Sequence, residues 1–376
     1  MRSMRVLVVG GGIGGLSSAL ALRFAGARVR VYEQAAELGE VGAGVGLFPN
    51  SIRILQRIGV ADSVARRGAP INEWWMLTPG GSVMSHQVAG RDGPISSLGI
   101  YRPDLVAELA AGLPRGVLHT GHRCVAFRQD DRYAVVTFDN GVSVEADVVI
   151  AADGIHSTLR SYVVEPRRPV FSGVVAYRGV MPAARVPGWP WSHALVNWVS
   201  QGKHFLVFPV RAGTMLNYVG FVPADDQMRE SWSAPGDPAV LAAEFADWDP
   251  WLSRLLSHID TTFRWGLYDR DPLPRWTNGR LALLGDAAHA MLPHMGQGAN
   301  QAIEDGMALA TVMRGTDTAE VTEALIRYQR LRHDHTARVQ QGSRANGMRM
   351  NAGQAIAIGL PGVHDYDVEA EARARR

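Results

Sequence analysis

The stretch Arg5–Gly15, RVLVVGGGIGG, decides the fold of this 376-residue chain. Its first part, Arg5–Val9, is a short apolar run rich in valine, which is typical of a buried parallel strand. Gly10, Gly12 and Gly15 then satisfy the pattern G-x-G-x-x-G. The first glycine allows a tight turn, the second lets the backbone approach a pyrophosphate, and the third lets helix and strand pack closely. The pattern predicts a dinucleotide at the N-terminal end of the following helix.

The residues around this glycine loop support the prediction. A helical pattern over Gly14–Phe24 stops at Gly26, and Arg28–Tyr32 has the composition of a second strand. Glu33 ends that strand, eighteen residues after the last glycine of the motif, where a carboxylate accepts hydrogen bonds from an adenosine ribose. A glycine-rich turn without a ligand is the alternative, because the glycine pattern alone is weak evidence.

Composition and charge exclude several classes of protein. The net charge is +2 and the basic residues are scattered, so the sequence predicts no nucleic-acid-binding face. Cys124 is the only cysteine, which excludes a disulfide within the chain and argues against a thiolate metal site; we predict no metal. Neither a signal peptide nor a run of eighteen apolar residues is found, so we expect a cytoplasmic protein without a membrane span.

Buried-strand patterns recur far along the chain, at Asp147–Ala151 and Arg280–Leu284. Between them, four alternating runs predict an antiparallel sheet: Val174–Arg178, Ala194–Val199, His204–Val210 and Met215–Val222. The predicted fold is α/β, with a Rossmann-type dinucleotide-binding domain from discontinuous segments, an inserted antiparallel-sheet substrate domain and a C-terminal helical region. A single Rossmann half followed by an independent domain fits less well. The expected division is 1–70, 100–168 and 275–315 for the dinucleotide-binding domain, 71–99 and 169–274 for the substrate domain, and 316–376 for the helical region.

Other patterns fill in this outline. Helices are predicted near Ser51–Ile58, over Pro103–Ala111, from Ala299 and over Glu320–Arg338. Asn72–Gly99 is predicted to form strands of a half-buried sheet, and Cys124–Ala146 contains a hairpin around Asp139-Asn140-Gly141.

A second motif, DVVIAADGIHSTLR, covers Asp147–Arg160. Its strand delivers Asp153 and Gly154 at the carboxyl end, where ligands bind in open α/β sheets. A strand-end turn capped by Asp153 is the alternative for this motif taken alone.

A third motif, RLALLGDAAHAMLPHMGQGANQAIEDG, covers Arg280–Gly306 and favours FAD as the dinucleotide. Asp286 follows a strand and is suited to bind the ribityl chain or a ribose hydroxyl. Gly296 and Gly298 precede a helix that starts near Ala299. The free N–H groups and the dipole of that helix stabilise negative charge, such as the charge on the N1–C2=O edge of a reduced flavin.

In this order and spacing, the three motifs resemble the single-component FAD-dependent aromatic monooxygenases, the group A flavoprotein hydroxylases with the p-hydroxybenzoate hydroxylase-like fold. The resemblance is strongest to salicylate hydroxylase and 6-hydroxynicotinate 3-monooxygenase, and it spans nearly the whole chain. Further matching stretches are GAGVGLFPN (Gly42–Asn50), YRPDL (Tyr101–Leu105), the run from Tyr177 through Trp232, and HDYDVEAE (His364–Glu371).

The resemblance implies an activity. Such enzymes are NAD(P)H-dependent FAD monooxygenases that hydroxylate a small phenolic, salicylate-like or hydroxypyridine-like aromatic with O₂ through a C4a-hydroperoxyflavin. Because the chain has a single G-x-G-x-x-G, NADH or NADPH is expected to dock transiently rather than on a domain of its own.

The resemblance also implies roles for single residues. Arg102 would contact the FAD pyrophosphate or ribityl region, with a surface arginine as the alternative. Asp153 would be shared between FAD and NAD(P)H pyrophosphate binding, and Pro293 would line the isoalloxazine and substrate side. The predicted cofactor-binding residues are Gly10, Gly12, Ile13, Gly14, Gly15, Glu33, Gly44, Gly46, Arg102, Asp153, Asp286, Gly296, Gly298 and Ala299.

Two positions depart from the hydroxynicotinate-type relatives, which have a histidine at the position of Gly46 and a tyrosine at that of Phe208. His204 in GKHFLVFPV does match a family histidine, and we predict that it orients or deprotonates the substrate. A half-buried histidine bonded to the backbone is the alternative. His204 and Pro293 are the candidate catalytic residues. The candidate wall residues, each of which could equally be core, are Trp75, Trp198, Phe208, Tyr218, Met291 and His294.

Other functions remain open at this point. The same scaffold suits a flavin epoxidase or heteroatom oxygenase, an FAD-dependent reductase that does not activate O₂, and a non-catalytic FAD-binding protein. Arg178 is a candidate partner for a substrate carboxylate, or else a solvated charge at the end of a strand. The expected partners are a small aromatic substrate and O₂, and the expected state is a monomer or homodimer.

Overall fold

The computed structural model describes residues 4–39, 42–89, 97–224, 234–356 and 362–374. Its first elements are β1 (Arg5–Val9), α1 (Ile13–Phe24) and β2 (Arg28–Tyr32), which form the predicted βαβ unit. β1 pairs in parallel with β2 and, on its other side, with β12 (Val148–Ala151). The glycine loop therefore leaves the carboxyl end of a strand in the middle of a sheet, which is where open α/β sheets bind ligands.

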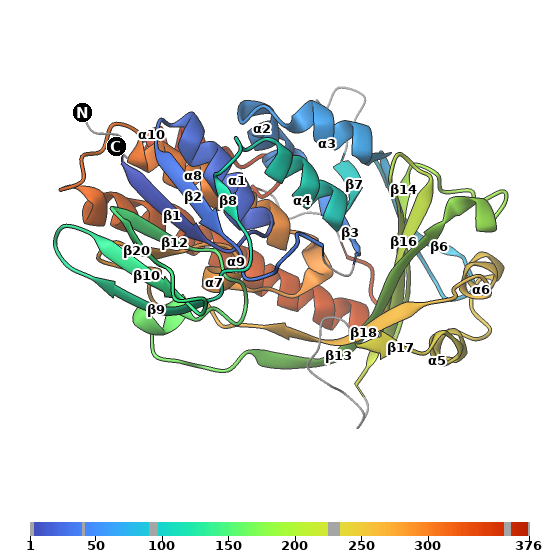
Figure 1. The fold of residues 1–376 in the computed structure, drawn as a ribbon. Coiled ribbons are helices and arrows are strands. Elements are labelled where there is room, and N and C mark those ends of the chain that lie inside the picture. The colour runs from blue at the N-terminus through green and yellow to red at the C-terminus, as the bar shows by residue number, and fades with distance from the viewer. Residues whose placement is uncertain (1–3, 40–41, 90–96, 225–233, 357–361, 375–376) are drawn as a thin grey trace.

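This first sheet has six strands in the order β19-β20-β12-β1-β2-β8. Its outer strands are β19 (Thr277–Asn278), β20 (Leu281–Leu283) and β8 (Leu118–His119). Only the pairing of β19 with β20 is antiparallel. The strands come from three separated parts of the chain, so the predicted assembly from discontinuous segments is confirmed. The apolar runs of β1, β12 and β20 are buried because helices, α1 among them, pack on one face of the sheet and strands from residues 124–146 pack on the other (Figure 1).

Helices α8 (Gly298–Met313) and α1 pack directly on each other. Gly306 makes this possible, because a Cβ there would lie 2.7 Å from the Cα of Ser18. α9 (Val321–Asn351) continues beyond the predicted end at Arg338, since residues such as Val339, Ser343 and Met350 extend its buried face. Further helices are α2 (Pro49–Arg57), α3 (Ala61–Arg67), α4 (Arg102–Ala111), α7 (Asp286–His289), α10 (Val368–Ala374), and the short η1 (Leu159–Tyr162), η2 (Ala183–Arg185) and η3 (Pro293–Met295).

A second sheet has eight strands in the order β17-β18-β13-β16-β15-β14-β5-β6. They are β17 (Pro235–Gly236), β18 (Thr262–Asp269), β13 (Val170–Pro182), β16 (Met215–Pro223), β15 (Lys203–Val210), β14 (Ala194–Ser200), β5 (Glu73–Leu77) and β6 (Val83–Val88). All pairings are antiparallel, as predicted, except that β14 and β5 are parallel.

The two faces of this eight-stranded sheet bury different partners. One face packs under α5 (Pro238–Glu244) and α6 (Pro250–Leu256), which lie on its outer side at the right of Figure 1. The other face turns toward β3 (Gly44–Leu47), η3 and α9. We call the second one the inner face. Because side chains alternate along a strand, each strand contributes every second residue to it.

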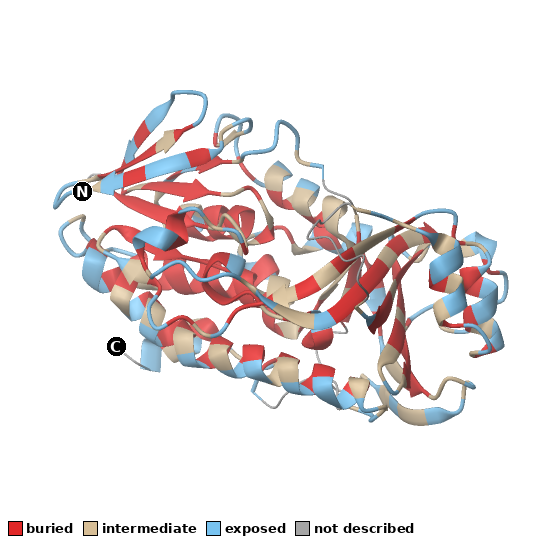
Figure 2. Cartoon of the chain, turned by 90° about the horizontal axis from the view of Figure 1, so that it is seen from below, coloured by how far each residue is buried: buried red, intermediate tan, exposed pale blue. Residues whose placement is uncertain are grey.

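Two three-stranded sheets complete the fold. One is the predicted hairpin of β10 (Ala134–Phe138) and β11 (Ser143–Ala146), extended by β9 (Cys124–Gln129). The other joins β3, β7 (Ser97–Tyr101) and β4 (Ala69–Ile71), so residues 97–99 do not lie in the eight-stranded sheet with β5 and β6. Figure 2 shows the buried core running through both larger sheets. Among the described helices, none is both long and apolar enough to cross a membrane.

Candidate functional site

The glycine loop forms a cradle with one open side. Gly10 has φ = +111°, and a Cβ there would lie 2.2 Å from the carbonyl oxygen of Ala152. At Gly15 a Cβ would lie 1.9 Å from the carbonyl oxygen of Gly10. At Gly12, by contrast, a Cβ would meet nothing within 4 Å. The protein's own packing therefore requires glycine at the first and last positions. At Gly12 the missing side chain instead leaves open space beside the backbone, which a pyrophosphate needs in order to approach it.

Glu33 is held beside this cradle at the carboxyl end of β2. Its Oε2 accepts a hydrogen bond of 2.6 Å from the N–H of Gly11, and its Oε1 accepts one of 2.8 Å from Ala35. A carboxylate has about four lone-pair positions, so both oxygens keep acceptor capacity for ribose hydroxyls. The arrangement fits the predicted adenosine end of the site.

Arg160 ties together the turns that follow β12 and β20. This buried side chain donates to the carbonyl oxygens of Ile155 (2.8 Å), Gly154 (3.0 Å), Ala287 (2.7 Å) and Asp286 (3.2 Å). It therefore holds the two turns that carry the predicted FAD-binding aspartates, Asp153 and Asp286, in fixed positions relative to each other. Burial lowers the pKa of Arg160 to about 10, with Arg270 adding to the effect, so the side chain stays charged at neutral pH.

Arg102 lies near enough to Asp286 and Glu33 for their charges to act on it. Burial lowers the pKa of Arg102, and the negative charges of Asp286 and Glu33 oppose that shift. Arg102 begins α4, and its backbone N–H donates to the carbonyl of Ala43 at 2.8 Å, which links it to β3. The burial of Asp153 raises the pKa of its carboxyl group, whose Oδ2 accepts from Leu159 at 3.2 Å.

Asn300 joins the β3 segment to the start of α8. Its Nδ2 donates to the carbonyls of Gly46 (2.9 Å) and Gly296 (2.8 Å), while its Oδ1 accepts from the Phe48 N–H at 3.0 Å. No side chain caps the N-terminus of α8, which begins at Gly298. The predicted flavin-facing glycines are thereby brought together beside free helical N–H groups.

The same β3 segment lies against the inner face of the eight-stranded sheet. The N–H of Gly44 donates to Oδ1 of Asn217 at 2.6 Å, and a Cβ at Gly44 would lie 2.7 Å from the ring of Phe208. Phe208 is buried there with Ile71 and Val210. The structure thus sets the predicted wall residue Phe208 directly beside the predicted cofactor segment.

His204 also lies on the inner face, fully buried in β15. Its ring stacks on Phe221 with centroids 4.0 Å apart, and the ring of His294 lies 5.5 Å away. Neither ring nitrogen of His204 has a hydrogen-bond partner among the described residues, so the alternative of a histidine bonded to the backbone is wrong. Burial, and secondarily His294, lowers the pKa of His204 well below its usual range, which leaves the imidazole neutral.

Acid should destabilise the protein through these buried histidines. Burial lowers the pKa of His294 to about 4 and that of His335 to about 3. Below pH ~6.5 the unfolded chain binds protons that the folded chain excludes, so the free energy of unfolding falls with pH until the folded pKa is passed. For His294 alone this amounts to about 2 kcal/mol between pH 7 and 5.

The check is urea unfolding at pH 7, 6 and 5 with saturating FAD. We expect His294→Gln to lose less stability on acidification than the wild type, and the exposed control His193→Gln to behave like the wild type. An unchanged pH dependence in His294→Gln would contradict the assignment.

Three predicted wall residues, Trp75, Trp198 and Tyr218, lie on the outer face of the sheet instead. Trp75 is half-buried there and donates its indole N–H to Glu73 at 2.9 Å. Trp198 and Tyr218 are buried on the outer face, under α5 and α6. Trp198 donates its indole N–H to Asp249 at 2.9 Å, and Tyr218 donates its hydroxyl to the carbonyl of Thr261 at 2.7 Å. Both are core residues, because each sits one position out of phase with the inner-face residues of its own strand.

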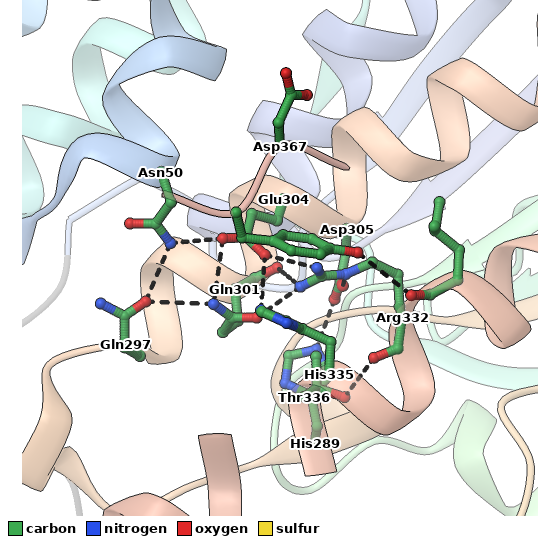
Figure 3. A network of polar contacts seen from close by, with 12 residues as sticks. Asn50, His289, Gln297, Gln301, Glu304, Asp305, Arg332, His335, Thr336 and Asp367 are labelled. Carbon is green, nitrogen blue, oxygen red and sulfur yellow. Dashed lines mark hydrogen bonds and ion pairs between the residues drawn. The ribbon is translucent and has the colours of Figure 1, made fainter. Parts of the chain in front are cut away.

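A buried ionic cluster links α8 and α9 to the turn that precedes Asp286 (Figure 3). Arg332 of α9 donates to Oε2 of Glu304 at 2.6 Å and to Oδ1 of Asp305 at 2.8 Å. Oδ2 of Asp305 in turn pairs with His289 at 2.6 Å and accepts from the Gly285 N–H at 3.0 Å. The cluster, defined as these five residues, connects α9 to the turn that carries Asp286.

Charge balance explains the protonation of this cluster. Burial raises the pKa of Asp305, but the charges of His289 and Arg332 outweigh it and lower that pKa overall. Burial also raises the pKa of Glu304, only partly offset by Arg332 and Asn50, so Glu304 is the weaker acid of the two. Asn50 of the GAGVGLFPN stretch donates to Glu304 at 2.5 Å and so attaches the start of α2 to the cluster.

Several of these residues escape a search by motif. Arg160 ends the second motif without being singled out, and Asn300 lies just inside the third. Asn217 and Arg332 have no local signal, because their partners lie 173 and about 28 positions away in sequence and only the fold joins them. Pro293 is exposed at the start of η3, next to His294.

The chain is similar in sequence and in structure to several known proteins. The FAD binding domain family matches residues 3–343. A 3-amino-4-hydroxybenzoate 2-monooxygenase of Streptomyces platensis is 36% identical, over 91% of this chain and 87% of its own. A 6-hydroxynicotinate 3-monooxygenase of Bordetella bronchiseptica is 34% identical, over 98% and 96%. A solved salicylate hydroxylase–substrate complex has a TM-score of 0.81 at 28% identity, over 99% and 97%.

Proposed function

The chain belongs to the FAD-binding-domain family of flavoprotein aromatic monooxygenases, and from this premise we propose which of its residues hold the cofactor and the substrate. It is an FAD-dependent enzyme that hydroxylates an aromatic ring. When bound, FAD accepts electrons from NADH or NADPH and activates O₂ for transfer to that ring. Everything else in the reaction depends on how the chain's own residues bind, orient and shield the reactants.

The proposed cofactor site runs from the glycine cradle to the start of α8. Gly12 and the N–H groups of Ile13 and Gly14 bind the pyrophosphate, and Glu33 binds the adenosine ribose. The open space at Gly12 supports this fit, because nothing within the protein fills it. The other proposed contacts are Gly10, Gly15, Gly44, Gly46, Arg102, Asp153, Asp286, Gly296, Gly298 and Ala299.

The uncapped N-terminus of α8 has a proposed electrostatic role. Its N–H groups and helix dipole stabilise negative charge on the reduced cofactor. Asn300 keeps Gly46 and Gly296 close to that helix end. The negative charge of the reduced cofactor would therefore develop next to N–H groups that already point toward it.

The substrate is proposed to lie between β3 and the inner face of the eight-stranded sheet. The observation that carries this assignment is the buried, neutral imidazole of His204, neither of whose ring nitrogens has a hydrogen-bond partner among the described residues, beside an apolar cluster of the inner face. A neutral imidazole accepts a hydrogen bond from a ring hydroxyl and draws its proton away, which makes the ring more electron-rich. Phe221 stacks on the imidazole, and the apolar cluster to which Phe221 belongs continues through Leu292 and Trp265, which excludes water from this wall.

His204→Ala should bind FAD normally and lose coupling between NAD(P)H oxidation and product formation. We expect kcat/KM for a phenolic substrate to fall about 100-fold, in the range of a lost general base, with a larger share of reducing equivalents released as H₂O₂. His193→Ala, an exposed histidine eleven positions earlier, is the control. Unchanged coupling in His204→Ala would assign this histidine to structure.

The activity itself is tested on the purified yellow protein. NAD(P)H oxidation, O₂ uptake and H₂O₂ release are measured with and without phenols, salicylates and hydroxypyridines, and products are identified by mass. Coupled ring hydroxylation supports the proposal. Oxygen transfer to an alkene or heteroatom would identify an epoxidase or heteroatom oxygenase instead, and flavin reduction without any oxygenated product would identify a reductase.

Location and assembly complete the proposal. A cytoplasmic monomer or homodimer is consistent with a chain whose single cysteine is buried and with use of the NAD(P)H pool. The six-stranded sheet then serves the cofactor, and the eight-stranded sheet serves the substrate.

A further inference from the structure

Arg178 occupies a central place on the inner face of the eight-stranded sheet. On β13 it is flanked by Val219 of β16 and Phe263 of β18. Its guanidinium does not extend to solvent at a strand end, as one alternative from the sequence had it. It lies over the ring of Trp265, 3.7 Å from the ring centroid. The charged group is therefore held against an aromatic surface.

Nothing in the described part of the chain neutralises this cation. The guanidinium has no hydrogen bond or ion pair there, and its Nε is buried without a partner. Burial lowers the pKa of Arg178, and the like charge of Arg102 lowers it further. An unpaired cation shielded from water is costly, so its retention calls for an anion that arrives later.

Other buried arginines of this protein show the contrast. Arg160 is surrounded by carbonyl oxygens, Arg332 is paired with Glu304 and Asp305, and Arg270 donates to the carbonyls of Ile155 and Arg167. Each of these holds two segments of the chain together. Arg178 holds none, which leaves its donors for a ligand.

The position of Arg178 relative to His204 suggests what the anion is attached to. Trp265, Ala176, Phe221 and His204 lie side by side in one row across four adjacent strands. At a strand spacing of about 4.8 Å, the ends of this row are about 14 Å apart at the backbone. Ala176, in the middle, is small. The guanidinium over Trp265 and the imidazole on Phe221 thus lie at opposite ends of this row, a span that suits one aromatic ring with a substituent at each end.

We infer that Arg178 binds a carboxylate of the substrate, so that the enzyme acts on a hydroxylated aromatic acid whose hydroxyl faces His204. This inference rests on the proposed function. A guanidinium matches a carboxylate with two parallel N–H···O bonds, which fixes the plane and the direction of the ring. The carboxylate also neutralises the uncompensated charge. Trp265 holds the guanidinium in the required orientation before the substrate arrives.

The test compares matched acids and amides on the holoenzyme. Dissociation constants for the hydroxybenzoate isomers and the corresponding hydroxybenzamides are measured from the perturbation of the flavin spectrum, for the wild type, Arg178→Met and Arg178→Lys. We expect Arg178→Met to weaken binding of the acids about 10- to 30-fold, the size of a lost charge-assisted pair, and to leave the amides within about twofold. Arg178→Lys should retain part of the affinity for the acids and, if the Met variant does not fold, supplies the comparison alone.

Controls separate this inference from its alternatives. Arg264→Met changes an arginine of β18 that faces the outer side, over Tyr177, and should leave acid binding unchanged. Affinity for FAD is measured for every variant. A loss of FAD affinity in Arg178→Met, or an equal loss for acids and amides, would overturn the inference. Acid binding that depends on Arg178 without any hydroxylated product would instead count against the proposed function and leave the carboxylate site standing.

Discussion

Gly12→Ala should fold as the wild type does and bind FAD about 100-fold more weakly. An added methyl group meets no protein atom within 4 Å, and the backbone of Gly12, with φ = −77° and ψ = −174°, is one that alanine adopts without strain. The methyl group would instead occupy the space into which the pyrophosphate must come. Steric overlap of this kind costs about 1–3 kcal/mol, and the upper end of that range corresponds to the expected loss of affinity.

The measurement is FAD titration of the apoprotein, followed by fluorescence quenching, alongside the melting temperature without FAD. Gly80→Ala is the matched control, since a Cβ there also meets nothing within 4 Å and lies far from the cradle. Gly15→Ala provides the opposite case, because its Cβ would overlap the carbonyl oxygen of Gly10 and damage the fold itself. Normal FAD affinity in Gly12→Ala would show that the cofactor does not use this space.

Replacement of Arg332 by methionine should destabilise the folded protein by about 3–5 kcal/mol. The side chain is wholly buried and is the cation that balances Glu304 and Asp305 (Figure 3). Without it, two carboxylates remain buried side by side and one of them must take up a proton. With unfolding entropy proportional to chain length, the expected fall in melting temperature is about 4–6 °C.

A second effect should accompany this loss of stability. Asp305 also holds the N–H of Gly285, the residue before Asp286, so its rearrangement should weaken FAD binding. Arg330→Met is the control on the same helix, with a side chain that is 70% exposed, and should change stability by no more than about 0.5 kcal/mol. The triple variant Arg332→Met, Glu304→Gln, Asp305→Asn should recover part of the loss. Wild-type stability in Arg332→Met alone would refute the ionic account.

The family and the general architecture are predictable from sequence because they depend on local patterns. A strand, three glycines and a helix occupy adjacent positions, so the G-x-G-x-x-G pattern and the residues beside it are enough to predict this part of the fold. The second and third motifs work in the same way, and the predicted α/β fold with discontinuous segments is confirmed. The predicted end of the last long helix near Arg338 is wrong because the buried face of α9 continues on polar and small residues such as Gln340, Ser343 and Gly347.

The substrate side is less predictable, for a reason of geometry. An alternating strand reveals that it has two faces but not which of them meets the cofactor. When both faces are buried, as on β15 and β16, tryptophan and tyrosine mark either one equally well. Trp198 and Tyr218 were therefore expected in the wall and belong to the outer core. Phe208 and His204 lie on the inner face, and Asn217, which binds Gly44, carries no signal that a motif could report.

The order of the strands in the six-stranded sheet also constrains how the chain reaches its native state. β1 precedes in the chain both β12, which pairs with it, and β20 beyond that, which come from residues 148–151 and 281–283. α1 packs on α8, at residues 298–313. The nucleotide cradle at the N-terminus therefore stays incomplete on the ribosome until most of the polypeptide has emerged. Such long-range closure slows folding and exposes apolar strand edges until these distant segments have paired.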